Sequence, residues 1–189
     1  MKDIRLLSLR QEDRPAYEAL YESSFPASER KDLDFMLTGD NSAAYEVLAV
    51  STPDCPVAGM VITVTHGNLT MLDYLAISPD LRGQGLGHAV LPMVRDHVKA
   101  QNGGRFFLEI ETPPPLCIPR DPCANAAQRV RRMAFYASAG MVETGVRAFI
   151  YGNDMELLAF PEDAAAVTFE GYDALLRATF PADMVAERI

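Results

Sequence analysis

The spacing of apolar and polar residues divides the chain into strands and helices in an order typical of an α/β protein. Short runs rich in β-branched and aromatic residues predict strands, and apolar residues three and four apart predict helices. The predicted strands are Ile4–Leu9, Ala44–Ser51, Val57–Thr65, Leu69–Ile77, Arg105–Glu111, Met141–Tyr151 and Asp154–Phe160. The predicted helices are Ala16–Ser23, a second from Ala27 to Gly39, His88–Gln101, Asn125–Ala139 and one within Pro161–Ile189.

The connections between these elements predict a mixed sheet. Short turns join the three strands between Ala44 and Ile77, so these strands should form an antiparallel meander. Arg105–Glu111 follows a helix, which predicts that it pairs parallel to Leu69–Ile77 through a right-handed crossover. No repeat or linker interrupts the pattern. The sequence therefore predicts a single α/β domain over 1–189, with about seven strands flanked by helices.

Composition and charge narrow the class of protein. With 189 residues, 49% of them hydrophobic and 23% charged, the chain matches a soluble globular protein. No apolar run approaches the ~20 residues of a membrane helix, and the N-terminus lacks the apolar core of a signal peptide. The net charge of −9 disfavours nucleic-acid binding and favours a cationic or amine-bearing partner.

The cysteines and histidines predict neither a metal site nor a disulfide framework. Cys55, Cys117 and Cys123 lack the spacing of a zinc site, and the three histidines are too scattered in sequence for one. We therefore expect a reduced, cytoplasmic protein without a metal. A reactive thiol beside the proline-rich loop, at Cys117 or Cys123, is the alternative.

The stretch Arg82–Gly87, RGQGLG, predicts a phosphate-binding turn. Its three glycines stand at alternate positions between a predicted strand and a predicted helix, and glycine lets backbone N–H groups approach a ligand closely. A helix N-terminus then adds unpaired N–H groups and partial positive charge. The spacing is neither that of a dinucleotide-binding fold nor that of a P-loop. A glycine turn that serves close packing alone is the alternative.

Two segments in this order resemble the GNAT superfamily of acetyl-CoA-dependent N-acetyltransferases, of bacterial type. The first is Arg82-x-x-Gly85-x-Gly87 after the strand that ends at Ile77. The second is Phe135–Met141, FYASAGM, which is similar to the FYxxxGF segment of the family. The resemblance covers a core over 4–160 and leaves 161–189 as a helical extension. It implies that the strands Leu69–Ile77 and Arg105–Glu111 splay apart to admit the cosubstrate.

The resemblance also implies how acetyl-CoA is bound. Its pyrophosphate would lie on the amides of the glycine turn, its pantetheine arm along the preceding strand, and its thioester carbonyl near the N–H of Leu75. Tyr136 would protonate the departing thiolate, unless it is only packed between helix and sheet. The residues expected to contact the cosubstrate are Leu75, Ala76, Ile77, Arg82, Gly83, Gln84, Gly85, Leu86, Gly87, His88 and Tyr136.

Three strand carboxylates are candidates for the base that deprotonates the amine. Glu111 is the first choice because it stands at the end of its strand, and Glu109 and Asp73 are the others. Asp73 shares a strand face with Leu75. Such a carboxylate could instead anchor the cationic amine, with water taking the proton, or could simply face solvent.

Two further stretches bear on the acceptor and on the cosubstrate. Phe25, Glu29 and Arg30 are similar to an FPxxER stretch of some bacterial GNAT proteins and are expected to bind substrate, unless the stretch only caps a helix, with Ser28 as the cap. Arg129 stands where the family often has Asn. With Arg131 and Arg132 it could bind the CoA 3′-phosphate or an acidic acceptor group, or could face solvent and pair with the acidic surface.

The resemblance thus implies an N-acetyltransferase that moves acetyl from acetyl-CoA to a primary amine of a small molecule or peptide. The amine would attack directly in a ternary complex. We expect no nucleic-acid or membrane partner and a monomer or homodimer. A non-catalytic acyl-CoA-binding regulatory module, or an enzyme of this fold with another acyl group, is the alternative.

Overall fold

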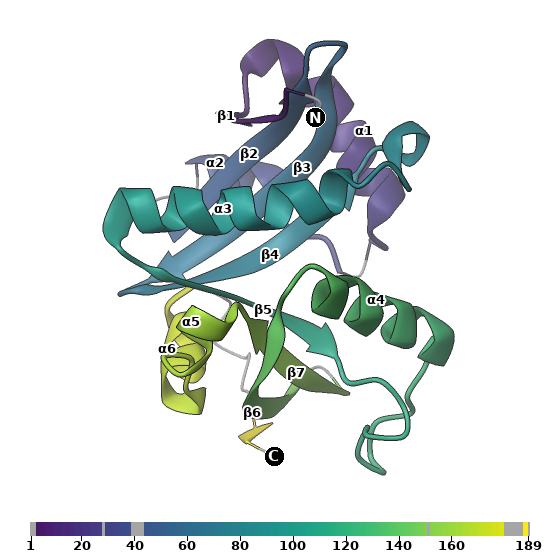
Figure 1. Ribbon diagram of the computed structural model, residues 1–189, viewed down its shortest axis with the longest axis vertical. Coiled ribbons are helices and arrows are strands. Elements are labelled where there is room, and N and C mark those ends of the chain that lie inside the picture. Colours follow the sequence, from purple (N-terminus) through teal and green to yellow (C-terminus); the bar gives the residue numbers. More distant parts are fainter. Residues whose placement is uncertain (1–2, 28, 39–43, 151, 180–186, 189) are drawn as a thin grey trace. The chain divides into compact units, whose positions relative to one another are not determined.

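The computed structural model describes residues 3–27, 29–38, 44–150, 152–179 and 187–188 (Figure 1). The chain forms two compact units. The first comprises Met1–Val64 and Leu72–His97, and the second comprises Thr65–Met71 and Val98–Ile189. The boundary passes through the strand β4 (Leu69–Ile77) and the helix α3 (Leu86–Asn102).

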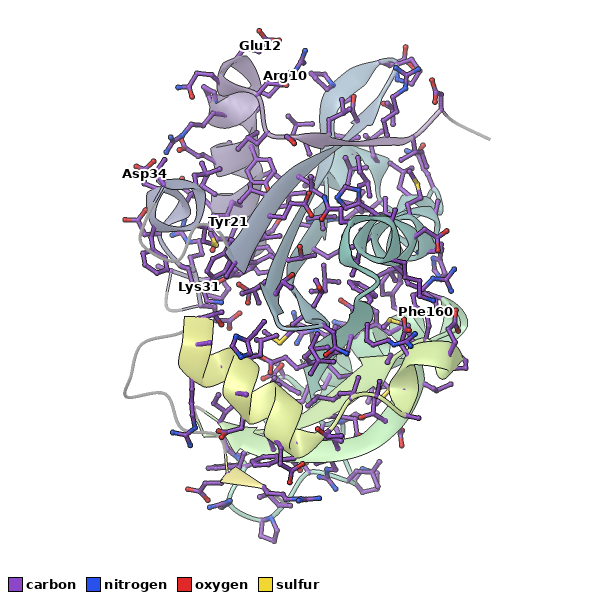
Figure 2. The ribbon with its side chains drawn as sticks, turned by 90° about the vertical axis from the view of Figure 1, so that its left-hand side faces the viewer. Arg10, Glu12, Tyr21, Lys31, Asp34 and Phe160 are labelled. Carbon is purple, nitrogen blue, oxygen red and sulfur yellow. A yellow bond between two sulfur atoms is a disulfide. The ribbon has the colours of Figure 1, made fainter. Side chains whose placement is uncertain are left out.

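The strands of the first unit carry its apolar core. β1 (Arg5–Ser8) pairs antiparallel with β2 (Tyr45–Thr52), which pairs antiparallel with β3 (Cys55–His66). Residues 57–64 of β3 are all buried, as expected for a strand covered on both faces. The cover on one face is α3, and on the other face it is α1 (Arg14–Ser24) with α2 (Leu33–Thr38) (Figures 1 and 2).

The first helix confirms the predicted pattern, and the second corrects it. In α1, Tyr17, Leu20 and Tyr21 are buried on one face, as their spacing predicts. The second helix begins at Leu33 and not at Ala27, so the predicted start is wrong. Its start is fixed by Asp32, whose carboxylate accepts hydrogen bonds from the amides at 34 and 35, at 2.7 and 3.3 Å. The expected cap Ser28 and the expected stop Gly39 lie outside the described residues.

The second unit is built around another set of antiparallel strands. β7 (Asn153–Ala159) pairs with β5 (Arg105–Glu111) on one side and with β6 (Val142–Ile150) on the other. The two-residue β8 (Glu187–Arg188) pairs with β6. Helix α4 lies on one side of these strands and α6 on the other (Figures 1 and 2). Helix α4 spans Ala126–Ser138, α5 spans Pro161–Ala164 and α6 spans Phe169–Thr179.

The C-terminal helix belongs to the core of the second unit. Tyr172, Leu175, Leu176 and Thr179 are buried along one stripe of α6, as their helical spacing predicts. Phe180, which continues that spacing, lies outside the described residues. The helix approaches closely because Gly171 has no side chain: a Cβ there would lie 2.6 Å from Cδ1 of Leu69. The extension therefore stabilises the strands that it covers.

The eight strands have the order β1-β2-β3-β4-β5-β7-β6-β8 in one sheet. This confirms the predicted class, a mixed α/β sheet flanked by helices, with β8 as the strand that the sequence pattern did not predict. The end of the predicted strand at Tyr151 lies outside the described residues. The single domain over 1–189, with its core over 4–160, stays a prediction. Among the described residues, no helix combines the length and the apolar character that crossing a bilayer requires.

A buried carboxylate makes the stability of the second unit depend on pH. Burial raises the pKa of Glu156 in β7 to about 7; the charges of Glu143 and Asp154 add to the rise, and Arg147 opposes it. Because the folded pKa lies above the ordinary 4.5, stability is greatest below that value and is lost as pH rises through about 7.

The substitution Glu156→Gln should remove this loss. We expect the free energy of unfolding to rise by about 1–3 kcal/mol relative to the original chain near pH 8, and to change little near pH 4. Urea unfolding at the two pH values measures it, with the exposed Glu170→Gln in α6 as the control. The same change at both pH values would contradict the assignment.

Candidate active site

The glycine turn joins the end of β4 to the start of α3 and has the conformation that only glycine adopts readily. After the short helix η3 (Pro79–Leu81), Gly83 and Gly85 have φ of +72° and +80°. The Arg82 side chain turns back, and its Nε donates to the Ile77 carbonyl at 2.9 Å. The turn is therefore fixed to the end of the strand.

The turn meets the requirements of an anion site. Helix α3 starts at Leu86, and the first N–H groups of a helix have no acceptor within it. A Cβ added at Gly83 or at Gly85 would meet no atom within 4 Å, so the outer side of the turn is open. A pyrophosphate suits this turn for three reasons. Backbone N–H groups can donate to it, the positive end of the 17-residue helix α3 attracts it, and the guanidinium of Arg82 adds positive charge.

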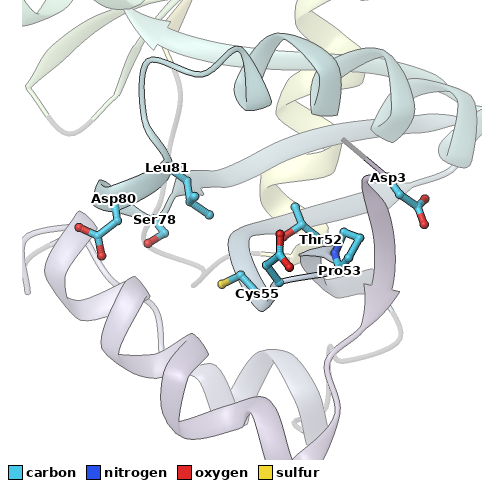
Figure 3. Close-up of a pocket in the computed structure, with 8 residues that line it drawn as sticks. Asp3, Thr52, Pro53, Cys55, Ser78, Asp80 and Leu81 are labelled. Atoms are coloured by element: carbon cyan, nitrogen blue, oxygen red, sulfur yellow. The ribbon is translucent and has the colours of Figure 1, made fainter. Parts of the chain in front are cut away.

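A nearby pocket of about 410 Å³ has a different character (Figure 3). It lies in the first unit, beside the turn between β2 and β3, and Ser78 and Leu81 line its other side. Three carboxylates, of Asp3, Asp54 and Asp80, are among its lining groups and would repel phosphate. None of the predicted site residues lines it, so we do not place the cosubstrate there.

Asp73 lies on β4, on the same strand face as Leu75 and almost buried. Its Oδ2 accepts a hydrogen bond from Lys31 Nζ at 2.5 Å. Burial raises the pKa of Asp73, and the Lys31 ammonium acts against that rise. The raised pKa suits a group that accepts a proton from an amine.

Two of the three predicted acceptor residues contact Tyr74, the neighbour of Asp73 on β4. Phe25 ends α1 and packs edge-on against Tyr74, with ring centroids 5.0 Å apart. The main-chain carbonyl of Glu29 accepts a hydrogen bond from the Tyr74 hydroxyl at 2.6 Å. Arg30 Nη1 lies 3.4 Å from a carboxylate oxygen of Glu22. Because the helix begins after these residues, they do not cap it, and their role in substrate binding stays a prediction.

Tyr136 lies in the last turn of α4, in the second unit. Burial raises its pKa to about 12, although the positive charge of Arg132 opposes the rise, so the phenol stays protonated at neutral pH. The helix ends because Gly140 takes a φ of +89°; its N–H donates to the Ala137 carbonyl and that of Met141 to Tyr136. The FYxxxG spacing thus fixes the tyrosine relative to the helix end.

The two predicted bases on β5 both have strong partners within the second unit. Glu111 forms ion pairs with Arg129 and Arg132, each at 3.1 Å. Glu109 accepts a hydrogen bond from the hydroxyl of Tyr172 in α6. The Glu111 carboxylate is therefore already engaged by two guanidinium groups, and the Glu109 carboxylate by a hydroxyl.

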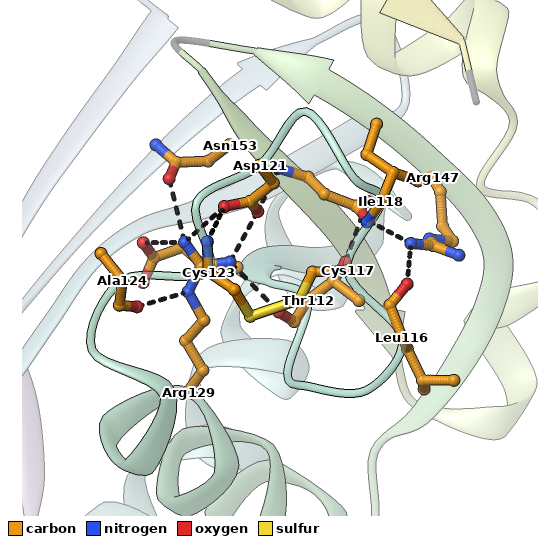
Figure 4. A network of polar contacts seen from close by, with 12 residues as sticks. Thr112, Leu116, Cys117, Ile118, Asp121, Cys123, Ala124, Arg129, Arg147 and Asn153 are labelled. Carbon is orange, nitrogen blue, oxygen red and sulfur yellow. Dashed lines mark hydrogen bonds and ion pairs between the residues drawn. A yellow bond between two sulfur atoms is a disulfide. The ribbon is translucent and has the colours of Figure 1, made fainter.

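Arg129 is completely buried and uses all five of its N–H groups (Figure 4). Nε donates to the Ala124 carbonyl at 2.9 Å, and Nη1 donates to the Thr112 carbonyl at 3.2 Å. Both Nη atoms reach the Asp121 carboxylate, at 2.6 and 3.2 Å, and Nη2 also reaches Asn153 Oδ1 at 3.0 Å. Arg129 therefore clamps the loop before α4, and neither solvation nor binding of the CoA 3′-phosphate, both weighed above, fits this residue.

The same loop contains a disulfide, so the expectation of unpaired cysteines is wrong. Cys117 and Cys123 are bonded, with Cα atoms 6.4 Å apart, and Cys55 is the free cysteine. The short loop between them places Asp121 next to Arg129, and the Cys123 amide also donates to Asp121 at 2.6 Å. The cytoplasmic location stays a prediction.

Comparison with known families settles the class. A sequence model of the acetyltransferase (GNAT) family matches residues 6–114, more than half of the chain. The chain belongs to the GNAT family of acetyltransferases. The matched part includes β4, the glycine turn and α3, whereas Tyr136 lies beyond it.

Solved GNAT structures share the fold. A GNAT acetyltransferase described from Bacteroides thetaiotaomicron is 20% identical with a TM-score of 0.67, covering 92% of this chain and 96% of that one. A Vibrio cholerae spermidine N-acetyltransferase in complex with CoA and spermine is 14% identical with a TM-score of 0.60, covering 85% and 97%. The Escherichia coli ribosomal-protein-S18-alanine N-acetyltransferase is 23% identical with a TM-score of 0.54, covering 84% and 93%. No curated protein matches the chain significantly.

The family identifies this GNAT protein as an N-acetyltransferase, and the family draws its acetyl group from acetyl-CoA. The binding and catalytic residues remain predictions. Within the described ranges, no three His, Cys, Asp or Glu side chains are grouped to hold a metal ion.

The glycine turn can be tested apart from catalysis. The substitution Gly85→Ala places a Cβ on a residue with φ +80° and should strain or shift the turn, which costs about 1–2 kcal/mol. We expect the Kd for CoA, measured by calorimetry, to rise about tenfold. The control is Gly103→Ala, which imposes similar strain at φ +65° after the other end of α3. Equal effects of both variants on the Kd would contradict a binding role for the turn.

The structure places residues beside the predicted base Asp73 that the sequence did not indicate. Lys31 pairs with Asp73, and its ammonium lies over the rings of Tyr45 and Tyr74. The partnership of Lys31 with Asp73 spans 42 residues of sequence, so no local pattern could predict it. For Arg129, the sequence offered one indication: an arginine stands where the family often has Asn. This substitution indicated that the residue has a different role, but it did not indicate a buried one.

Proposed function

We propose that this N-acetyltransferase transfers acetyl from acetyl-CoA directly to a primary amine of a small molecule or peptide, within a ternary complex. The observation that supports it most is the glycine turn: two left-handed glycines precede the N-terminus of α3 within the part matched by the family. The amides of Gly83–Gly87 would hold the pyrophosphate, with the Arg82 guanidinium beside them.

The strand before the turn would position the thioester. Extended backbone at Leu75, Ala76 and Ile77 can pair with the amide groups of the pantetheine arm. The N–H of Leu75 would then donate to the thioester carbonyl oxygen, whose negative charge grows as the amine attacks. Tyr136 would return a proton to the sulfur, as its place in the FYxxxG segment implies and its high pKa permits.

For the proton of the amine, the contacts change the order of the candidates. Glu111 has two guanidinium partners and Glu109 has a hydroxyl partner, whereas Asp73 has a raised pKa and shares the strand face of Leu75. We therefore place Asp73 first as the group that meets the acceptor nitrogen and takes its proton. Phe25, Glu29 and Arg30 would border the acceptor.

Initial rates test direct attack. With acetyl-CoA and an accepted amine both varied, a ternary complex predicts double-reciprocal lines that intersect. Parallel lines, together with labelled acetyl retained on the protein after incubation without amine, would show a covalent acetyl-enzyme and overturn the proposal.

A further inference from the structure

The ammonium group of Lys31 lies in a cage of one carboxylate and two aromatic rings. Lys31 Nζ is 2.5 Å from Asp73 Oδ2, 5.6 Å from the ring centroid of Tyr45 and 5.5 Å from that of Tyr74. A carboxylate combined with aromatic faces is how proteins recognise alkylammonium ions. We call Asp73, Tyr45 and Tyr74 the ammonium cage.

The cage is held in place by its own neighbours. The Tyr74 ring packs edge-on against the rings of Tyr21 and Phe25, at 5.0 Å between centroids in both cases. Its hydroxyl donates to the Glu29 carbonyl at 2.6 Å. None of these contacts involves the side chain of Lys31, so the Tyr74 ring is held independently of it. The Tyr45 ring packs edge-on against Phe35, with centroids 6.2 Å apart.

The backbone of Lys31 is anchored separately from its side chain. Its N–H donates to the hydroxyl oxygens of Tyr21 and Tyr74, at 2.9 and 3.2 Å. The Tyr21 hydroxyl in turn donates to the Lys31 carbonyl at 3.2 Å. The flexible four-carbon stem can therefore swing out while the backbone stays in place.

A pocket borders Lys31 from outside the cage. Tyr21 and Lys31, both labelled in Figure 2, line this pocket of about 470 Å³ beside α1, which is large enough for a small ligand. Asp73, Tyr45 and Tyr74 are not among its described lining residues, so a ligand in the pocket would reach the cage as the Lys31 side chain moves aside. Apart from Lys31, its charged groups are two arginines and an excess of carboxylates. These carboxylates are Glu18, Glu22, Asp32 and Asp34. Such a lining favours a cationic ligand.

Asp73 requires a positive partner. Its side chain is only 9% exposed, and removing the partner of a buried carboxylate leaves an uncompensated charge. If the side chain of Lys31 leaves, another cation of similar shape should take its place. The ammonium group of a linear primary amine matches the group that the cage already holds.

We propose that the ammonium cage is the recognition site for the amino group of the acceptor, that the acceptor is a linear primary alkylammonium, and that Lys31 is a tethered occupant that the acceptor displaces. The role of the bound amine as acetyl acceptor rests on the proposed function, whereas cation binding by the cage does not. The location fits, because residues two apart on one strand face lie about 7 Å from each other, and Leu75 is two residues from Asp73.

Thermal unfolding of Lys31→Ala tests the binding without any turnover. We expect n-butylammonium chloride, well above its Kd, to raise the midpoint of this variant by about 2–4 °C more than that of the original chain. n-Butanol, the uncharged control, should have no such effect. The double variant Lys31→Ala, Asp73→Asn should lose the response to the cation.

Every other result overturns the proposal. A response that is absent from Lys31→Ala, or equal in the double variant, shows that the cage does not bind alkylammonium. If Lys31→Ala does not fold, Lys31→Gln is taken through the same measurements; if neither folds, Lys31 is a structural requirement and not a displaceable occupant.

Kinetics separate this inference from the proposed function. In the active enzyme, Lys31→Ala should lower the KM for linear primary amines at least about threefold, because the tethered competitor is gone. An unchanged or higher KM overturns the acceptor role. If the original chain acetylates no amine while the thermal response is present, the proposed function fails and the cation site stands.

Discussion

The substitution Arg129→Met is expected to lower the free energy of unfolding by about 3–5 kcal/mol. Arg129 is fully buried, and its main partner, the carboxylate of Asp121, is buried as well. Methionine fills similar space but leaves that carboxylate, and the carbonyls that the guanidinium satisfied, without donors. The loss is large because an unpaired buried charge costs more than the ion pair contributes.

Urea unfolding measures this effect, with the exposed Arg131→Met as the matched control. The control should stay within about 0.5 kcal/mol of the original chain. Equal losses of unfolding free energy in the two variants would contradict the clamping role of Arg129.

The dependence of stability on acid pH gives a second test of the same contact. Burial opposes the ionisation of Asp121, but hydrogen bonds led by that of Arg129 outweigh burial and lower the pKa of Asp121. That contribution is present at neutral pH and is lost as pH falls through the lowered pKa, so Arg129→Met should weaken this acid dependence.

The substitution Tyr136→Phe is expected to reduce kcat by about 10²–10⁴-fold. Phenylalanine keeps the ring and removes the hydroxyl proposed to protonate the thiolate. Because the pKa of Tyr136 is raised to about 12, the original enzyme should show no loss of activity from this group below about pH 11. The CoA Kd should change much less than kcat, since phosphate binding is assigned to the glycine turn.

Steady-state assays of CoA release, together with calorimetry for the Kd, measure both quantities. The control is Tyr17→Phe, which removes another buried hydroxyl, one that donates to the Val61 carbonyl at 3.3 Å in the first unit. It should affect stability and leave kcat near the original value. Unchanged turnover in Tyr136→Phe would remove this tyrosine from the acid role.

Local sequence patterns predicted the helices and strands well where turn residues mark both ends. The bounds of β4 and β5 in the structure are those predicted from the sequence, Leu69–Ile77 and Arg105–Glu111. Glycine and asparagine precede each of these strands, and apolar residues fill them. The glycine turn was predicted for the same reason, because its residue types determine its backbone conformation.

The start of α2 could not be predicted from local patterns, because Ser28 and Asp32 are both good caps.

Contacts between residues in different elements could not be predicted from local patterns either. Arg129 could be buried only because the loop brings Asp121 and several carbonyls around it, which its own sequence does not show. Likewise, the pairing of Cys117 with Cys123 required the loop to bring their Cα atoms within 6.4 Å.

Analysis of the reaction products tests whether this chain acetylates amines. The purified chain is incubated with acetyl-CoA and a panel of amines that includes linear alkylamines, diamines and lysine-containing peptides, and both products are quantified by mass spectrometry and by thiol release. We expect at least one linear primary amine to gain an acetyl group, with one CoA thiol released for each group transferred. CoA binding that stabilises the protein, with no acetylated amine from any member of the panel, would contradict it.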